Sequence, residues 1–374
     1  MNDIKTVKDF NFEGKRVLIR VDFNVPLDEG AEIISDNKIR ESISTIKYIL
    51  DNNCKQIVLM SHLGRPNGFD EKLKMNKISE RLKEILEIDL VKMDDCIDIE
   101  IPSDKKIVLL ENLRFHKEEE LNDQEFAKKL SRHGEIYVYD AFGSYREHAS
   151  TVSVQKYIPN CMGLLVEKEI SNLSLENKEK PIVGIIGGSK ISTKFPLIFK
   201  LLRKVDYLLV GGALAYVFLK AKGYEIGKSF SDDNFLDDAR ELMKSKKIIL
   251  PIDINCKNED KNINLDIENI DINCEGLDLG VKSIELFKEY LDKANTVIFS
   301  GPLGYYQEEE FAKGTLELGK YLANSDKTII ICGGDTETVL NKLKSKFTYV
   351  STGGGAAIEF LSGNKLAPIE ALKC

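Results

Sequence analysis

The feature that most constrains the fold of this sequence is a repeat of short apolar segments, each ending in polar residues and each followed by a helical stretch. In the first half these segments are 16–25, 56–60, 107–110 and 135–139. Amphipathic helices are expected between them, over about 40–50, 76–86 and 123–132. Apolar strands that alternate with helices are typical of a parallel sheet covered on both faces. We therefore predict a doubly wound α/β domain in the first half.

Polar and basic side chains gather where these strands end. Open α/β sheets bind their ligands at the carboxyl ends of the strands. Any one of these residues has an ordinary alternative role, as a surface arginine, a capping aspartate or a core histidine. Basic groups that recur at equivalent positions favour an anion site instead. The residues at this edge are Asp22, Asn24, His62, Arg65, Arg114, Arg146 and His148.

A second series of strands and helices begins at residue 181, with the stretch PIVGIIGGSKISTK. A buried strand over 181–186 leads into a glycine turn and then a helix whose first turns carry Lys190 and Lys194. Glycines let the backbone approach a ligand closely, and a helix N-terminus attracts anions. The stretch predicts a phosphate cradle. Taken alone, it is equally consistent with a plain turn followed by solvated lysines.

Further strands are expected at 207–210, 248–254, 296–299, 328–331 and 347–351, and four of them end in glycine turns. These turns contain Gly211 and Gly212, the 301–304 segment, Gly333 and Gly334, and the 353–355 segment. Asp335 follows one of them and suits Mg²⁺, a hard cation that is usually shared with substrate phosphates. Its ordinary alternative role is that of a helix N-cap.

Length and composition restrict the function. The 374 residues suggest two domains, joined around 166–180, and the 255–273 segment, rich in Asn, Asp and Glu, is expected to be an exposed hairpin or loop. A formal net charge of −8 argues against nucleic acid as the main partner. Seven scattered cysteines without a CxxC pair indicate a reducing cytosol, and no apolar run approaches membrane-spanning length. We therefore expect a cytoplasmic protein without a membrane partner.

Two apparent nucleotide motifs are rejected. The segment GYEIGKS at 223–229 is one residue too short for a P-loop and follows a helix instead of a strand. No GxGxxG opens the first helix, so a dinucleotide-binding domain is not supported.

Eight ordered motifs together resemble the signature of the phosphoglycerate kinase family, and the resemblance covers the whole chain. They are RVDFNVP (20–26), SHLGRP (61–66), ENLRF (111–115), DAFG with HAST (140–151), GGSK (187–190), GPLG (301–304), GGDT (333–336) and STGGGA (351–356). The resemblance implies two Rossmann-like α/β domains joined by a hinge helix. Residues 1–166, completed by 352–374, would bind phosphoglycerate, and residues 167–351 would hold the hinge helix and bind the nucleotide.

The resemblance also implies the reaction and its residues. The family transfers the acyl phosphate of 1,3-bisphosphoglycerate to ADP, giving 3-phosphoglycerate and ATP, with Mg²⁺ and by closure of the two domains, as a monomer. The implied substrate ligands are Asp22, Asn24, Lys38, Arg40, His62, Arg65, Arg114 and Arg146. The implied nucleotide ligands are Lys190, Lys194, Gly211, Gly212, Gln307, Gly333, Gly334, Asp335 and Thr336. Lys190 would stabilise the phosphoryl group in transfer, Asp335 would hold the metal, and Gly334 and Gly354 would offer catalytic backbone N–H groups.

The sequence departs from the family pattern at several of these positions. Lys38 stands where the family has its catalytic arginine, and Arg40 is the alternative; lysine keeps the charge but loses the planar fork. The 143–148 segment is one residue shorter than usual, and Tyr139 replaces an asparagine. In the nucleotide half, Ser300 replaces an asparagine, Gln307 replaces the ribose-binding glutamate and Cys332 replaces a glycine. The 273–276 segment, Asn-Cys-Glu-Gly, replaces a turn that contains Gly-Trp.

These departures keep two other functions open: a non-catalytic descendant that binds without turnover, and a kinase of another phosphorylated carboxylate.

Overall fold

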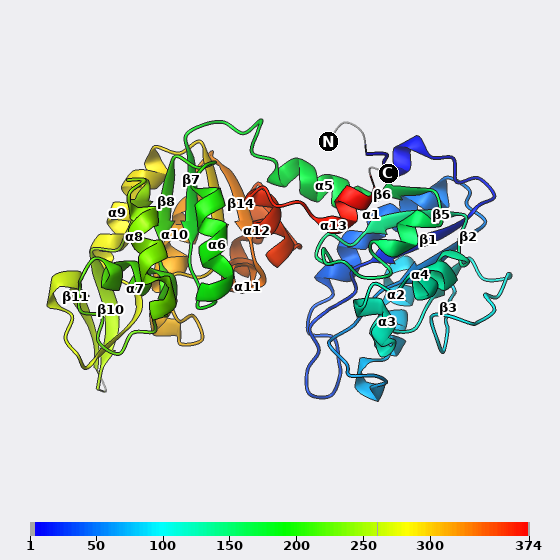
Figure 1. Ribbon diagram of the computed structural model, residues 1–374, viewed down its shortest axis with the longest axis horizontal. Helices are drawn as coiled ribbons and strands as arrows, with labels where there is room; N and C mark the ends of the chain where they lie inside the picture. The colour runs from blue at the N-terminus through cyan, green and yellow to red at the C-terminus, as the bar shows by residue number, and fades with distance from the viewer. Residues whose placement is uncertain (1–3, 260, 373–374) are drawn as a thin grey trace. The chain divides into compact units, whose positions relative to one another are not determined.

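The computed structural model describes residues 4–259 and 261–372, and the chain divides into two compact units. The first unit comprises Met1–Ser171 with Lys365–Cys374, and the second comprises Asn172–Asn364. Each unit is a parallel sheet with helices on its faces (Figure 1). The predicted pair of doubly wound α/β domains is confirmed.

The sheet of the first unit has six parallel strands in the order β3-β4-β2-β1-β5-β6. Its strands are β1 (Arg16–Val21), β2 (Gln56–Met60), β3 (Leu90–Lys92), β4 (Ile107–Leu109), β5 (Ile136–Asp140) and β6 (Asn160–Met162). Its helices are α1 (Asn37–Asp51), α2 (Asn76–Leu86), α3 (Lys117–Glu120), α4 (Gln124–Ser131), α5 (Leu164–Leu173) and α13 (Ala367–Ala371). The strand and helix at 56–60 and 76–86 lie where the apolar pattern predicts them.

The core of this unit explains why its strands are almost continuously apolar. β2 and β4 are buried along their whole length, and β1 is buried from its second residue onward. Helices cover both faces of the sheet, so side chains that point either way meet apolar partners. Polar side chains can then reach solvent or ligand chiefly where the strands end.

The second unit repeats this plan with a six-stranded parallel sheet in the order β15-β14-β13-β7-β8-β9. Its strands are β7 (Ile182–Ile186), β8 (Tyr207–Val210), β9 (Ile248–Ile249), β13 (Thr296–Ser300), β14 (Thr328–Cys332) and β15 (Tyr349–Val350). Its helices are α6 (Ile191–Leu201), α7 (Gly212–Ala221), α8 (Leu236–Met243), α9 (Val281–Asp292), α10 (Lys313–Ala323), α11 (Gly334–Leu340) and α12 (Gly355–Leu361).

A small antiparallel sheet in the second unit corrects one prediction. The single strand expected at 248–254 is wrong: β9 ends at Ile249, Pro251 follows, and β10 (Asp253–Asn258) belongs to another sheet. β10 pairs with β11 (Lys261–Asp266) and β12 (Cys274–Leu279). Proline cannot donate to a strand ladder, so it separates the two sheets. The hairpin alternative for the 255–273 segment is confirmed over β10 and β11.

The unit boundaries differ from the domain limits that we predicted at 166 and 352. Most of α5 belongs to the first unit, up to Ser171. At the other end α12 packs against α6 of the second unit, and the chain rejoins the first unit only at Lys365. There Gln155 donates a 3.0 Å hydrogen bond to the carbonyl of Pro368 in α13.

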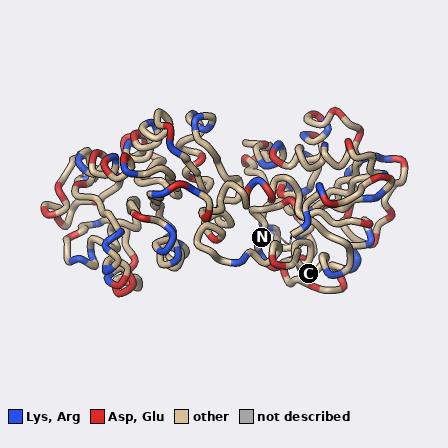
Figure 2. The backbone as a smooth tube through the Cα atoms, turned by 90° about the horizontal axis from the view of Figure 1, so that it is seen from above, with Lys and Arg blue, Asp and Glu red and all other residues tan. Residues whose placement is uncertain are grey.

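Acidic and basic residues are interspersed along both units (Figure 2). Among the described residues, none of the helices has the length and apolar character needed to span a membrane.

Candidate active site

The end of β1 places a carboxylate beside the first turn of α1. Lys38 Nζ lies 2.9 Å from Asp22 Oδ2, and both side chains are largely buried. Burial acts to raise the pKa of Asp22, but nearby positive charge outweighs it, that of Lys38 first and that of Arg20 in addition, and holds that pKa at about 2. Arg40 instead pairs with Asp36 at 2.9 Å and is more than half exposed. The structure therefore joins Lys38, and not Arg40, to Asp22.

A glycine turn after β2 connects two further residues of the predicted anion site. Gly64 has a φ of +65°, and a Cβ there would lie 2.8 Å from the side-chain methyls of Leu73, so this position favours glycine. Its N–H donates to Asn24 Oδ1 at 2.8 Å, and its carbonyl accepts from Arg114 NH1 at 2.7 Å. The turn thus fixes Asn24 and Arg114 relative to each other.

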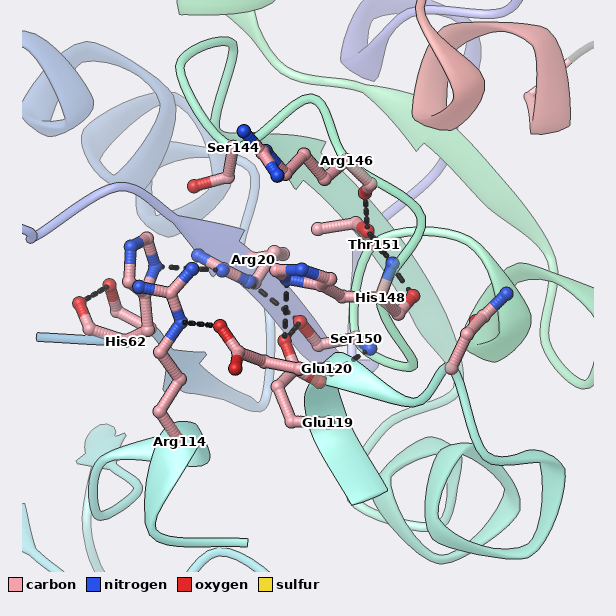
Figure 3. Close-up of polar contacts among 12 residues, drawn as sticks. Arg20, His62, Arg114, Glu119, Glu120, Ser144, Arg146, His148, Ser150 and Thr151 are labelled. Carbon is pink, nitrogen blue, oxygen red and sulfur yellow. Dashed lines mark hydrogen bonds and ion pairs between the residues drawn. The ribbon is translucent and has the colours of Figure 1, made fainter. Parts of the chain in front are cut away.

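Arg20 is fully buried at the end of β1 and lies between His62 and Ser150 (Figure 3). It donates to Ser150 Oγ at 2.8 Å and to the carbonyl of Val21 at 2.5 Å, and it lies 3.1 Å from His62 Nδ1. Our sequence reading of the anion site omitted Arg20, Ser150 and Glu119. The position of Arg20 inside the apolar run of β1 is a usable signal, because a buried charge needs partners.

The other basic residues of the site act on one another electrostatically. Burial, with Arg20, Arg114 and Arg146 nearby, lowers the pKa of His148 to about 4. Burial also lowers the pKa of Arg114, to which Arg20 and Arg65 contribute and which the Glu120 carboxylate opposes. That carboxylate lies 3.1 Å from Arg114 Nε. Arg65 and Arg146 are exposed, so this cluster has a buried base and an open rim.

Tyr139 holds the short loop that carries Arg146 in place by hydrogen bonds. Its hydroxyl lies 2.9 Å from the carbonyl of Ala141 and 3.2 Å from that of Ser144, and the ring is buried in β5. Thr151 Oγ1 donates to the carbonyl of Arg146 at 2.8 Å. Tyr139 therefore supports the loop that carries Arg146.

In the second unit, three glycine-containing loops meet at the ends of β7, β8 and β13. A Cβ on Gly187 would lie 2.2 Å from the carbonyl oxygen of Pro302, and one on Gly212 would lie 2.6 Å from the N–H of Gly188. Gly212 has a φ of +59° and donates to the carbonyl of Leu303 at 2.9 Å. The backbone approaches itself so closely here that no side chain fits.

The two lysines of this region differ in position. α6 begins at Ile191, so Lys190 is its N-cap residue and is exposed, which corrects the prediction that both lysines lie in the helix. Lys194 points back and donates to the carbonyl of Gly187. Burial lowers the pKa of Lys194 to about 8; Asp335 opposes the shift and Lys190 adds to it.

A cavity of about 440 Å³ opens beside these loops. Lys190, Gly212, Gln307 and Asp335 line it together, as do aromatic residues that the sequence did not single out. The aromatic residues are Tyr216, Phe230, Tyr305 and Tyr306.

Asp335 is exposed in the first turn of α11, where it accepts a 3.3 Å hydrogen bond from the Tyr306 hydroxyl. Gly333 is the N-cap of that helix, so the alternative capping role for Asp335 is wrong. Thr336 is buried and accepts from the N–H of Gly301 at 2.6 Å. The hydroxyl of Ser300 is buried near Gly333 and has no hydrogen-bond partner among the described residues.

The remaining predicted glycines frame these loops. Gly211 precedes α7 as its N-cap in an extended conformation, and Gly354 caps α12 with a φ of +53°. A Cβ on Gly334 would meet nothing within 4 Å. Backbone N–H groups are therefore available at the starts of several helices.

One unit carries a basic cluster with a buried base, and the other carries a glycine-lined cavity with an exposed lysine and aspartate. These are features of an enzyme that handles phosphorylated ligands on two α/β domains. The family model for phosphoglycerate kinase matches residues 7–364. The chain belongs to the phosphoglycerate kinase family.

Individual relatives and solved structures agree with this assignment over nearly the whole chain. The chain is 43% identical to phosphoglycerate kinase of Dictyoglomus turgidum, covering 99% of this chain and 98% of that protein. It is 44% identical to that of a Nitratiruptor species, covering 99% of each. The structure of phosphoglycerate kinase from Coxiella burnetii matches with a TM-score of 0.88 at 35% identity, covering 99% of this chain and 98% of that one. That from Pyrococcus horikoshii matches with a TM-score of 0.85 at 29% identity, with the same coverage. The chain is accordingly a phosphotransferase with a carboxyl group as acceptor.

Proposed function

We propose that this enzyme reversibly transfers the acyl phosphate of 1,3-bisphosphoglycerate to ADP, giving 3-phosphoglycerate and ATP. The observation that carries the proposal is the cavity of the second unit, where Lys190 and Asp335 lie beside glycine loops that leave the backbone open. Family membership along the whole chain supports the same reaction.

The first unit would bind phosphoglycerate. Arg114, Arg65 and Arg146 would hold the phosphate that is not transferred, because guanidinium groups bind phosphate oxygens in pairs and fix its orientation. His62 would donate a hydrogen bond to the same anion. Asp22 and Asn24 would contact the glyceryl part.

Lys38 takes the position of the family's catalytic arginine in this proposal. It is held by Asp22 at the strand edge, whereas Arg40 is held by Asp36 at the surface. A lysine offers a point charge where arginine offers a fork. Lys38 would therefore neutralise charge on the phosphoryl group but would not fix its orientation with two parallel hydrogen bonds, as an arginine does.

The second unit would bind the nucleotide. Lys190 would stabilise the charge on the transferred group, and Lys194 would hold the nucleotide phosphates. Gln307 would bond to the ribose, with the adenine side formed by Gly211 and Gly212. Gly333, Gly334, Gly354 and Thr336 would offer hydrogen bonds to phosphoryl oxygens.

Asp335 suits a magnesium ion that is bound together with the nucleotide. Mg²⁺ is commonly held by one or two carboxylates plus substrate phosphates, and Asp335 is an exposed carboxylate in the cavity with only a long hydrogen bond from Tyr306. When bound, the ion would neutralise charge on the phosphate oxygens. No covalent intermediate on the protein is needed, because the acyl phosphate is already activated, so positioning and charge stabilisation supply the catalysis.

The test is a coupled assay of ATP-dependent phosphorylation of 3-phosphoglycerate with magnesium present. The parent is expected to be active and Lys190→Ala to lose about 10²-fold or more in turnover, the scale for removing one preorganised charge-stabilising donor. Lys200→Ala, at an exposed lysine in the last turn of α6, serves as the control and should stay near the parent value. An inactive parent would favour a non-catalytic binding role. Activity on another phosphorylated carboxylate in place of 3-phosphoglycerate would change the substrate of the proposal.

A further inference from the structure

A chain of buried polar contacts crosses the anion cluster of the first unit, from α3 to the turn after β2 (Figure 3). We propose that Glu119 is a positioning residue that acts through Ser150 and Arg20 to hold His62 as a neutral imidazole with its proton on Nε2. The inference rests on the proposed function only for the statement that His62 meets the substrate anion. Arg20, Ser150 and Glu119 are fully buried, and His62 is 6% exposed.

The direction of the first contacts follows from the Ser150 hydroxyl. Glu119 lies 2.6 Å from Ser150 Oγ through Oε1 and 2.9 Å from the Ser150 N–H through Oε2. An ionised carboxylate only accepts, so the hydroxyl proton of Ser150 points to Glu119. The lone pairs of Ser150 Oγ then face Arg20, whose Nε donates to it at 2.8 Å.

The direction of the last contact follows from Arg20. A guanidinium group has only donors, and NH2 of Arg20 lies 3.1 Å from His62 Nδ1. His62 Nδ1 must therefore accept, which requires a neutral ring. In a neutral imidazole whose Nδ1 is an acceptor, the proton is on Nε2. The other ring nitrogen of His62, Nε2, is then an uncharged N–H donor.

The charges around His62 act in the same direction. Burial lowers the pKa of His62 well below its usual range, and Arg20 adds to this effect while Asp22 opposes it. The charged groups facing His62 comprise three cations and one carboxylate: Arg20, Arg114, Lys38 and Asp22. Protonation would place a further positive charge among these cations.

Glu119 is the buried negative charge that compensates the buried positive charge of Arg20. An uncompensated buried arginine is strongly unfavourable, and Ser150 connects Arg20 to the carboxylate. Burial raises the pKa of Glu119, and Arg20 and the two hydrogen bonds from Ser150 oppose that shift. Glutamine at position 119 would have one acceptor oxygen for the two donors of Ser150, so one of these hydrogen bonds would be lost. Ser150 would then no longer hold the guanidinium group of Arg20 in its orientation toward His62.

The first test measures the tautomer of His62 directly, by nitrogen-15 NMR of the histidine ring nitrogens, with His62→Gln to assign the signals. In the parent, His62 should carry its proton on Nε2 and should not titrate between about pH 5.5 and 8, the range in which a free imidazole changes charge. Glu119→Gln should produce a mixture of tautomers or a titration within that range. Glu118→Gln, the preceding residue of α3 and only partly buried, is the matched control and should leave the spectrum unchanged.

The second test is kinetic. Glu119→Gln should raise the KM for 3-phosphoglycerate about tenfold, the effect of losing one well-formed hydrogen bond to an anion, with the KM for ATP within about twofold of the parent. Ser150→Ala cuts the same chain of contacts and should reproduce both results, so it replaces Glu119→Gln if that variant does not fold.

The outcomes separate this inference from the proposed function. A parent His62 that is protonated on Nδ1, or that titrates near its usual pKa, overturns the inference. The inference is also overturned if Glu119→Gln and Ser150→Ala both fold and both keep the parental spectrum and KM. Loss of the parental tautomer on Glu119→Gln in a chain without kinase activity would support the inference while removing the proposed function.

Discussion

The candidate sites of the two units are organised in different ways. In the first unit the anion cluster rests on buried side chains that hold one another, such as Arg20, Ser150 and Glu119. In the second unit the cavity is shaped by backbone, and its charged groups Lys190 and Asp335 are exposed. We infer that the first unit orients its ligand with preformed side-chain contacts. The second unit instead offers space and backbone N–H groups to its ligand.

If the backbone shapes the nucleotide site, the largest effect should come from a methyl group placed at the closest backbone approach. Gly187→Ala would set a Cβ 2.2 Å from the carbonyl oxygen of Pro302, which is a backbone atom and cannot turn aside. We expect a loss of about 10²-fold or more in kcat/KM for ATP and a lower Tm, because overpacking at a backbone contact costs about 1–3 kcal/mol. Steady-state kinetics and calorimetric unfolding provide the measurements.

Gly334→Ala is the matched variant for the stability part, since a Cβ there meets nothing within 4 Å. It should keep the parental Tm. Any loss of activity would then show that the added methyl group obstructs the ligand and not the protein's own packing. Equal losses of Tm in both variants would show that the contact with Pro302 is not the reason why a side chain at position 187 destabilises the protein.

If the first unit depends on preformed side-chain contacts, the two candidate cations of α1 should differ in effect. Lys38→Ala should lower kcat/KM for 3-phosphoglycerate by about 10–10²-fold, because it removes a charge-assisted contact at the end of β1. Arg40→Ala should stay within about threefold, because exposed ion pairs contribute little. Lys38→Arg should raise turnover if this position contacts the phosphoryl group, since arginine supplies the fork. The reverse ranking of the two alanine variants would move the role to Arg40.

The same contrast explains which parts of this molecule were predictable from its sequence. The helix at 76–86 and the strand at 56–60 depend on local apolar periodicity, so their positions follow from the pattern. Strand ends also revealed Asp22 and Arg114, because in a parallel sheet these ends meet at one edge. The Glu119–Ser150–Arg20 contacts join three segments that are distant in sequence, and no local pattern encodes such a meeting. Pro251 did carry a local signal for the break between β9 and β10, since it interrupts the strand ladder.

The proposed nucleotide site should weaken at alkaline pH. A lysine is charged below its pKa, so Lys194, with a pKa of about 8, loses its charge in the free enzyme as the pH rises through 8. We expect kcat/KM for ATP to fall up to about tenfold between about pH 7.5 and 9.5. Lys194→Arg should abolish this decline, because arginine stays protonated. A parental profile that is flat over this range, or a decline that persists in Lys194→Arg, would contradict the role of Lys194.

The anion site of the first unit should instead contribute stability that is lost at acid pH. The pKa of Asp22 is held at about 2, below its unfolded value near 4, so the folded state favours the ionised form. The resulting stabilisation is present above about pH 4 and disappears as the pH falls toward 2, and it amounts to about 2–3 kcal/mol. Denaturant unfolding of the parent and of Asp22→Asn should therefore give free energies of unfolding that differ at pH 7 and converge toward pH 2. Asp104→Asn, at an exposed carboxylate, controls for general charge effects. A difference between parent and Asp22→Asn that stays constant with pH would mean that packing around Asp22, and not its charge beside Lys38, stabilises the end of β1.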